Sequence, residues 1–299
     1  MHELHDMHCH LDFIEGAEAL AAEAGRVNTM IFANTVTPAG WLEAQERFGG
    51  FANVQVGFGM HPWWAAGEPE EPGNEDREGS QRTSRRREAQ AAEERRDLTE
   101  TESSRIAETM KLLDAGDPIF IGEVGLDFGW RHQQTRMVQE SMFESIAAWA
   151  GQRGGKLLSI HSIKSAQQVI DILDRTGALS TCACVFHWYS GPSDLLKRAI
   201  DAGCYFSCGF RMLDTKKGRE YVKAIPVDRI LLETDAPPER NTPFPYAELR
   251  RDLERAAEAV AAIKGPKALQ SIAETTRALL TPTPLIRSDE LGRQIVAEK

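Results

Sequence analysis

Short apolar runs rich in β-branched residues alternate along this chain with longer segments of helical character. Each run is followed by a helix-like stretch before the next begins, a pattern typical of βα units around a parallel sheet. A further helical region, residues 246–280, follows the last run. The eight runs expected to form strands are 4–6, 29–35, 54–60, 118–123, 156–161, 181–187, 205–208 and 230–233.

Eight strands with intervening helices in 299 residues predict an α/β fold, a TIM (β/α)8 barrel formed by the whole chain (1–299) as one domain. A doubly wound open sheet is the alternative. No G-x-G-x-x-G follows an expected strand, which argues against the usual dinucleotide-binding site.

The stretch from Glu68 to Arg105 interrupts this rhythm directly after the third expected strand. It holds 12 acidic and 8 basic residues among 38, with four apolar residues. Such a composition cannot bury a core face, so we expect a flexible, solvated insertion or a charged helix. Its position on the rim that carries catalytic loops also allows a lid, or an arm that binds partner proteins.

Composition narrows the classes of function. The net charge of −10 excludes a protein that grips duplex nucleic acid by its overall field, although bound metals could still contact phosphates locally. Five cysteines, an odd number, argue against a disulfide framework and favour a reducing, cytoplasmic location. No apolar run is long enough for a transmembrane helix, and the N-terminus does not resemble a secretory signal.

Metal-binding residue types recur where the expected strands end. His8 and His10 are two positions apart, so on extended backbone their side chains point the same way, as a chelating pair requires. Any one of these residues could instead be a satisfied core or rim group, but six at the ends of five strands are hard to explain that way. Together they suit Zn, Mn, Mg or Ni and are numerous enough for two ions. The six residues are His8, His10, Glu123, His161, His187 and Asp235.

The segments that carry these residues resemble the TatD family of metal-dependent nucleases, within the wider amidohydrolase-like barrels. They read D-M-H-C-H-L-D, G-M-H-P, G-E-V-G-L-D-F, I-H-S, F-H-W-Y-S-G and E-T-D-A-P, in the family's order from Asp6 to Pro237. One motif alone is weak, whereas all six in order are specific.

This resemblance implies a deoxyribonuclease that acts on DNA ends or single strands with two divalent ions (Mg, Mn or Zn). It implies that His8, His10 and Asp235 hold one ion, that His161 and His187 hold the other, and that Glu123 bridges them. Asp235 would also orient or deprotonate the attacking water, and His61 would contact the phosphate or another part of the substrate. Glu233, two residues before Asp235, is expected one layer deeper, either supporting a ligand or paired with a neighbour.

The chain departs from the family pattern around the expected substrate site. Ile163 stands where the family usually has Arg, and Lys164 follows it. The loop after E-T-D-A-P is short but contains Arg240, so Lys164 and Arg240 are the candidate basic substrate contacts. Trp188 could stack on a base or plug the barrel mouth. These departures suggest a specialised branch, such as the TatD-like subunit of a bacterial defence operon.

Two other functions remain open. An amidohydrolase that cleaves a C–N or ester bond would use the same barrel and the same His-x-His start. Many such enzymes bridge their metals with a carboxylated lysine, whereas this chain offers Glu123. A scaffold subunit of a larger complex, docking through residues 68–105, is the alternative outside enzymes.

Overall fold

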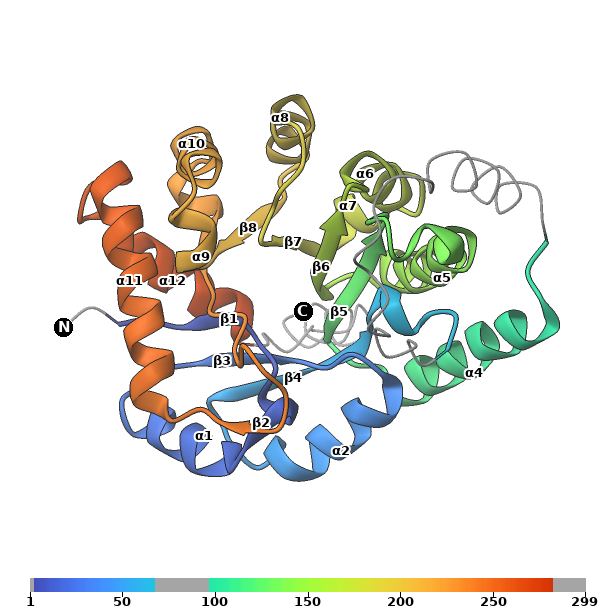
Figure 1. Cartoon of the computed structure of the whole chain (residues 1–299), viewed down its shortest axis with the longest axis horizontal. Helices are drawn as coiled ribbons and strands as arrows, with labels where there is room; N and C mark the ends of the chain where they lie inside the picture. The colour runs from blue at the N-terminus through green and yellow to red at the C-terminus, as the bar shows by residue number, and fades with distance from the viewer. Residues whose placement is uncertain (1–2, 68–96, 282–299) are drawn as a thin grey trace, which may run out of the picture.

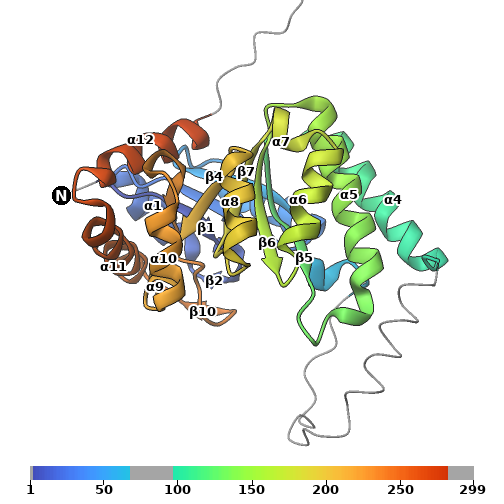
Figure 2. The ribbon, with the colours of Figure 1, turned by 90° about the horizontal axis from the view of Figure 1, so that it is seen from above.

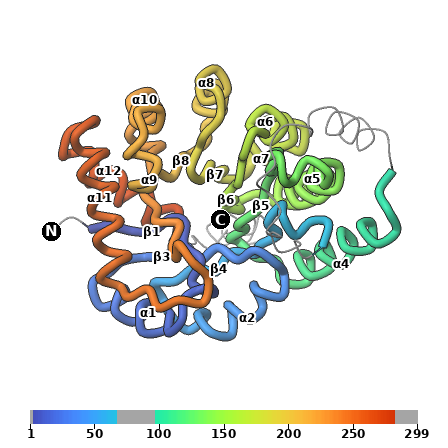
Figure 3. The backbone as a smooth tube through the Cα atoms, viewed as in Figure 1, coloured from blue at the N-terminus to red at the C-terminus, as the bar shows by residue number. Residues whose placement is uncertain are grey.

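A computed structural model describes residues 3–67 and 97–281. Its central sheet has eight parallel strands in the order β1-β3-β4-β5-β6-β7-β8-β9. Apart from the short strands β2 and β10, which lie outside this sheet, strands that follow one another in the chain are neighbours in the sheet. Figures 1 and 3 show the chain passing once around this sheet, from blue at β1 to orange after β9. The strands are β1 Asp6–Cys9, β3 Ile31–Asn34, β4 Val54–Met60, β5 Phe120–Asp127, β6 Leu157–Ile163, β7 Ala183–His187, β8 Tyr205–Cys208 and β9 Ile230–Leu232.

The helices cover the outside of the sheet. Seen from above, α10, α8, α6, α5 and α4 follow one another along it (Figure 2). The longer helices are α1 Ala17–Arg26, α2 Pro38–Phe48, α4 Glu100–Gly116, α5 Arg136–Arg153, α6 Ala166–Arg175, α8 Ser193–Asp201, α10 Lys216–Ala224, α11 Tyr246–Lys264 and α12 Ala268–Leu280. Short helices α7 (Ala178–Thr181) and α9 (Phe210–Leu213) and a small pair of strands, β2 (Ile14–Glu15) and β10 (Thr242–Pro243), complete the connections.

The first and last large strands meet, which makes the sheet a nearly closed barrel. The backbone N–H of Asp235 donates to the carbonyl of His8 at 2.8 Å, and the N–H of His10 donates to the carbonyl of Ala236 at 2.7 Å. The carboxylate of Asp6 accepts from the backbone N–H of Thr234 at 3.0 Å. The predicted barrel is therefore confirmed over the open sheet, and its closure brings β1 beside the end of β9.

A layer of apolar side chains fills the barrel beneath its carboxyl-terminal end. Leu157 and Val185 belong to this buried group, and each lies an even number of residues before a polar residue of the same strand. Leu231, also in the group, lies two residues before Glu233, which directly follows β9. The polar residues at the strand ends therefore lie directly above a layer of buried apolar side chains. The complete group is Met7, Phe32, Phe120, Leu157, Val185, Leu231 and Leu280.

Several strand boundaries differ from the sequence-based expectation, and two of the differences bear on the site. The first strand is Asp6–Cys9 rather than residues 4–6, and β5 continues beyond Glu123 to Asp127. In both cases the strand runs through polar residues, because the end of the barrel is a polar cavity in which such side chains find partners. The pairing register of β5 shifts between Ile121 and Val124, so alternation alone does not predict which side chains point inward.

The charged segment 68–105 lies largely outside the described residues, which resume at Asp97. Its last part forms the start of α4, where Thr99 and Glu102 make a capping box: the Thr99 side chain accepts from the Glu102 N–H, and the Glu102 carboxylate accepts from the Thr99 N–H. None of the helices in the described ranges is long and apolar enough to span a bilayer.

Candidate metal centre

The six predicted ligands meet at the carboxyl-terminal end of the barrel. His8 lies in β1 and His10 directly follows it, Glu123 lies in β5, His161 in β6, His187 ends β7, and Asp235 follows β9. Cys9, between the two histidines, packs in the core cluster outside the barrel, as alternation predicts. Parallel strands present their carboxyl ends to the same side, so residues distant in sequence converge.

The first group of ligand atoms surrounds one point. The Nε2 atoms of His8 and His10 are 3.3 Å apart and lie 3.5 and 3.3 Å from Oε2 of Glu123. Asp235 Oδ1 is 3.8 and 3.7 Å from the same two nitrogens. Four ligands bound tetrahedrally to zinc at 2.0–2.1 Å lie about 3.3–3.4 Å apart, so this spacing fits a small divalent ion.

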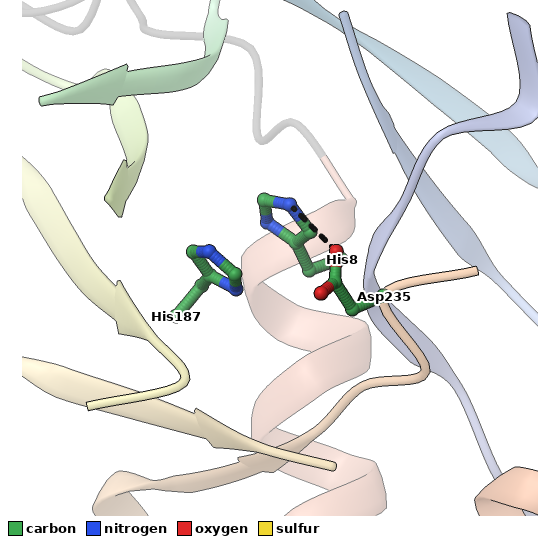
Figure 4. A group of neighbouring side chains, drawn as sticks. All are labelled: His8, His187 and Asp235. Carbon is green, nitrogen blue, oxygen red and sulfur yellow. Dashed lines mark ion pairs between the residues drawn. The ribbon is translucent and has the colours of Figure 1, made fainter. Parts of the chain in front are cut away.

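The second group surrounds the other oxygen of Glu123. His161 Nδ1, His187 Nε2 and His61 Nε2 lie 2.8, 3.1 and 3.4 Å from Oε1. The ring of His187 also stacks on that of His8 with centroids 3.9 Å apart, and Figure 4 shows this pair with Asp235. Glu123, 3% exposed, therefore presents one oxygen to each group.

Hydrogen bonds behind the rings fix which nitrogen faces the centre. His8 Nδ1 lies 2.8 Å from Ser159 Oγ, and His10 Nδ1 lies 2.9 Å from the carbonyl oxygen of Asn34. A partner behind Nδ1 leaves Nε2 to face the ligand cluster, as in many metal sites.

Glu233 lies behind His187, at ion-pair distance rather than hydrogen-bond distance. The fully buried carboxylate has Oε2 3.6 Å from His187 Nδ1, contacts the Ser207 hydroxyl, and accepts from the backbone N–H of Trp188 at 3.1 Å. Both expectations for Glu233 are therefore met at once, because it stands behind a candidate ligand and is paired with neighbours.

The electrostatics of the cluster act differently on its carboxylate and on its individual imidazoles. Burial raises the pKa of the Glu123 carboxyl, but the imidazoles of His61, His187 and His8 outweigh burial and hold this pKa well below its usual range. Burial lowers the pKa of His61 to about 4, and burial together with His187 lowers that of His8. Burial lowers the pKa values of His10, His161 and His187, but neighbouring carboxylates, Glu123 among them, raise these pKa values above the usual range of histidine. Ionised carboxylates and neutral imidazoles are the forms that coordinate cations, so an ion that binds here would displace protons from these three rings.

A cavity of about 480 Å³ opens above the ligand cluster. Phe13, Trp63, Trp64 and Trp188 supply aromatic walls. The guanidinium of Arg240 lies between two of them, 4.1 Å from the centroid of Phe13 and 4.8 Å from that of Trp64. The cavity is large enough for a small organic group and has both apolar and cationic surfaces.

The predicted substrate residues divide in two groups. His61, Trp188 and Arg240 line the cavity. Lys164 does not: it is exposed, on backbone with φ of 54°, while Ile163 before it lines the wall. Lys164 is not among the residues that line the cavity, so the structure gives the predicted Lys164 contact no support.

Sequence reasoning missed two charged residues of this region, one in the cavity wall and one behind it. Arg211, in α9 after β8, lines the cavity. Asp127, 4% exposed at the end of β5, accepts from Trp63 and contacts His161. Its even spacing from Glu123 was a usable signal, but the expected strand ended at Glu123. Burial raises the pKa of Asp127, but the hydrogen bonds from His161 and Trp63 outweigh burial and lower this pKa to about 2.

Known proteins match this chain over almost all of its length. The family model described as TatD related DNase matches residues 5–281. An uncharacterized metal-dependent hydrolase of Bacillus subtilis, YabD, is 30% identical over 56% of this chain, and the match spans 65% of that protein's length. A human protein named deoxyribonuclease TATDN3 is 26% identical over 94% of this chain and 95% of its own.

Solved structures share the fold. A TatD family hydrolase from Entamoeba histolytica superposes with a TM-score of 0.67 at 14% identity, covering 94% of this chain and 99% of its own. The TatD homologue YjjV of Escherichia coli gives 0.64 at 19% identity, covering 94% and 98%. The barrel, the ordered motifs and the match of the family model agree, and the chain belongs to the TatD-related DNase family.

Proposed function

We propose that this protein is a metal-dependent phosphodiesterase that cleaves DNA, with two divalent ions at the carboxyl-terminal end of the barrel. The observation that carries the proposal is the placement of Glu123, with Oε2 facing His8 and His10 and Oε1 facing His161 and His187. One carboxylate between two groups of imidazoles is suited to bridging two ions. The relative named deoxyribonuclease supports a nucleic-acid substrate.

Each group of residues has a role in this reaction. When bound, the ions supply Lewis-acid polarisation of the phosphodiester and a water of lowered pKa. Asp235 lies at the cavity wall with its side chain 25% exposed, and its backbone N–H is held by the carbonyl of His8. Its carboxylate can therefore orient a water and accept a proton beside the scissile phosphate.

The cavity walls complete the substrate site. Arg240 offers a guanidinium to a phosphate, with no ion pair to a carboxylate among the described residues, and the indole of Trp188 offers a face to a base. A negatively charged protein can thus bind DNA through local cations at one cavity.

Hydrolysis assays test the proposal. A short single-stranded DNA and a generic phosphodiester are incubated with protein loaded with Mg, Mn or Zn, then with chelator added. We expect cleavage that chelation abolishes and that His8→Ala and Glu123→Ala reduce by at least about 100-fold. Glu144→Gln, in α5 and paired with Arg175 away from the cluster, is the control. Cleavage that persists with chelator, or in both alanine variants, would contradict the proposal.

An ester or C–N bond substrate is the competing outcome. Hydrolysis of such a substrate by the loaded protein, without cleavage of either phosphodiester, would favour the amidohydrolase alternative. We place no partner protein at the segment 68–105, most of which lies outside the described residues.

A further inference from the structure

Asp127 is a buried carboxylate at the cavity for which the proposed metal centre has no ligand role. Donors occupy both of its oxygens. Oδ1 accepts from the N–H of Gly129 at 2.7 Å, and Oδ2 accepts from the indole N–H of Trp63 at 2.7 Å and lies 3.2 Å from Nε2 of His161. An ionised carboxylate only accepts hydrogen bonds, so the proton of this contact belongs to His161 Nε2.

The position of that proton decides which atom of His161 faces the centre. With Nε2 protonated and directed at Asp127, the opposite nitrogen, Nδ1, lies 2.8 Å from Oε1 of Glu123. Two carboxylates of the same strand therefore hold one imidazole from its two ends. A carboxylate behind a histidine commonly fixes the tautomer of a metal ligand in this way.

The same oxygen also holds the aromatic wall. Trp63 is 39% exposed and lines the cavity, while its ring stacks on His132 with centroids 4.9 Å apart and an interplanar angle of 14°. Its indole N–H bond to Asp127 prevents the ring from rotating out of this stack. Asp127 Oδ2 is thus the shared acceptor for Trp63, in the cavity wall, and for His161, a candidate metal ligand.

Asp127 is itself firmly placed. Its backbone N–H donates to Oε1 of Gln139 at 2.8 Å, and Gln139, fully buried in α5, donates to the carbonyl of His132 at 3.1 Å. One buried amide therefore fixes both Asp127 and the histidine on which Trp63 stacks.

We propose that Asp127 is a positioning residue that sets the metal-facing nitrogen of His161 and the orientation of the Trp63 wall together. The inference rests on the proposed metal centre and adds to it a residue that touches neither the ions nor the substrate. It predicts that the ligand and the wall change together when this carboxylate is altered.

The Asp127→Ala variant tests it. Alanine offers no side-chain acceptor to the Gly129 N–H, to the Trp63 indole or to His161. We expect binding of Zn²⁺ measured by calorimetry to weaken by about 10- to 100-fold at one site. In metal-free protein labelled with ¹⁵N, the His161 ring pattern and the Trp63 indole N–H resonance should both shift. Asp174→Ala, exposed on α6, is the matched control and should change neither.

Each outcome decides the matter. An Asp127→Ala protein that folds, by circular dichroism, and keeps the zinc affinity and both resonances would overturn the proposal. If that variant does not fold, Trp63→Phe replaces it, since the change removes one donor and keeps an aromatic ring. The His161 Nε2–H resonance should then move, because its acceptor is no longer shared, and an unmoved resonance overturns the proposal. No readout requires hydrolysis, so loss of the nuclease hypothesis is distinguishable from loss of this one.

Discussion

Replacing Glu123 by glutamine should remove metal binding from both halves of the centre. The side chain keeps its shape but loses its charge, and one of its two atoms becomes an NH₂ group that cannot coordinate a cation. In the native protein Oε2 lies 3.3–3.5 Å from His8 and His10, and Oε1 lies 2.8–3.1 Å from His161 and His187. Whichever way the amide turns, one group faces the NH₂ and the other a neutral, weaker ligand.

The size of the effect follows from linkage. An ion at 100 times its dissociation constant stabilises the folded state by about 2.7 kcal/mol per site. At about 2–4 °C per kcal/mol for a chain of this size, one occupied site raises Tm by roughly 5–10 °C, and two sites by up to about twice that. If the glutamine weakens binding 100-fold, the same concentration stabilises each site by only about 0.4 kcal/mol, or roughly 1–2 °C.

The assay is thermal unfolding of chelator-treated protein with and without added Zn or Mn. Glu144→Gln, which removes a surface carboxylate paired with Arg175, serves as the control and should keep the wild-type shift. If Glu123→Gln shows the full metal-induced increase in Tm, Glu123 is not a ligand and the bridging geometry has been misread.

Two further predictions concern the fold around this centre. Gly59→Ala should lower the free energy of unfolding by about 3 kcal/mol, because the added Cβ would lie 1.8 Å from the carbonyl oxygen of Thr35. Gly50→Ala is the control: its Cβ would meet nothing within 4 Å, so the free energy of unfolding should change by less than about 0.5 kcal/mol. Urea unfolding measures both, and equal effects would contradict the reasoning. Burial lowers the pKa of His5 from 6.5 to about 4, so the folded state favours the neutral imidazole. The contribution of this group to the stability of the fold is therefore complete above pH 6.5 and is lost as the pH falls towards 4. His5→Gln should therefore flatten the loss of stability between pH 6.5 and 4 in metal-free protein by up to about 3 kcal/mol, and parallel curves for the two proteins would show that His5 does not contribute.

Much of the candidate centre, the side chains that the fold brings together, was predictable because its signals are local. The pair His8 and His10 follows from two-residue spacing on a strand, and His187 follows an unbroken apolar run. Asp127 was missed for the opposite reason. Its strand passes through a shift of register after Ile121 and continues through charged residues that a sequence pattern treats as a strand end. Lys164 shows the same limit, since a basic residue beside a ligand proved to be exposed.

The sequence alone determined the alternating architecture and the types of ligand, because apolar periodicity and the chemistry of His, Asp and Glu are properties of neighbouring residues. Only the tertiary structure decided that β1 lies beside the end of β9, so that Asp235 joins His8 and His10. It also decided that the two oxygens of Glu123 face different imidazoles, and that Asp127 serves His161 and Trp63 through one atom. These arrangements depend on barrel closure and side-chain rotamers, which are set by packing between segments far apart in the chain.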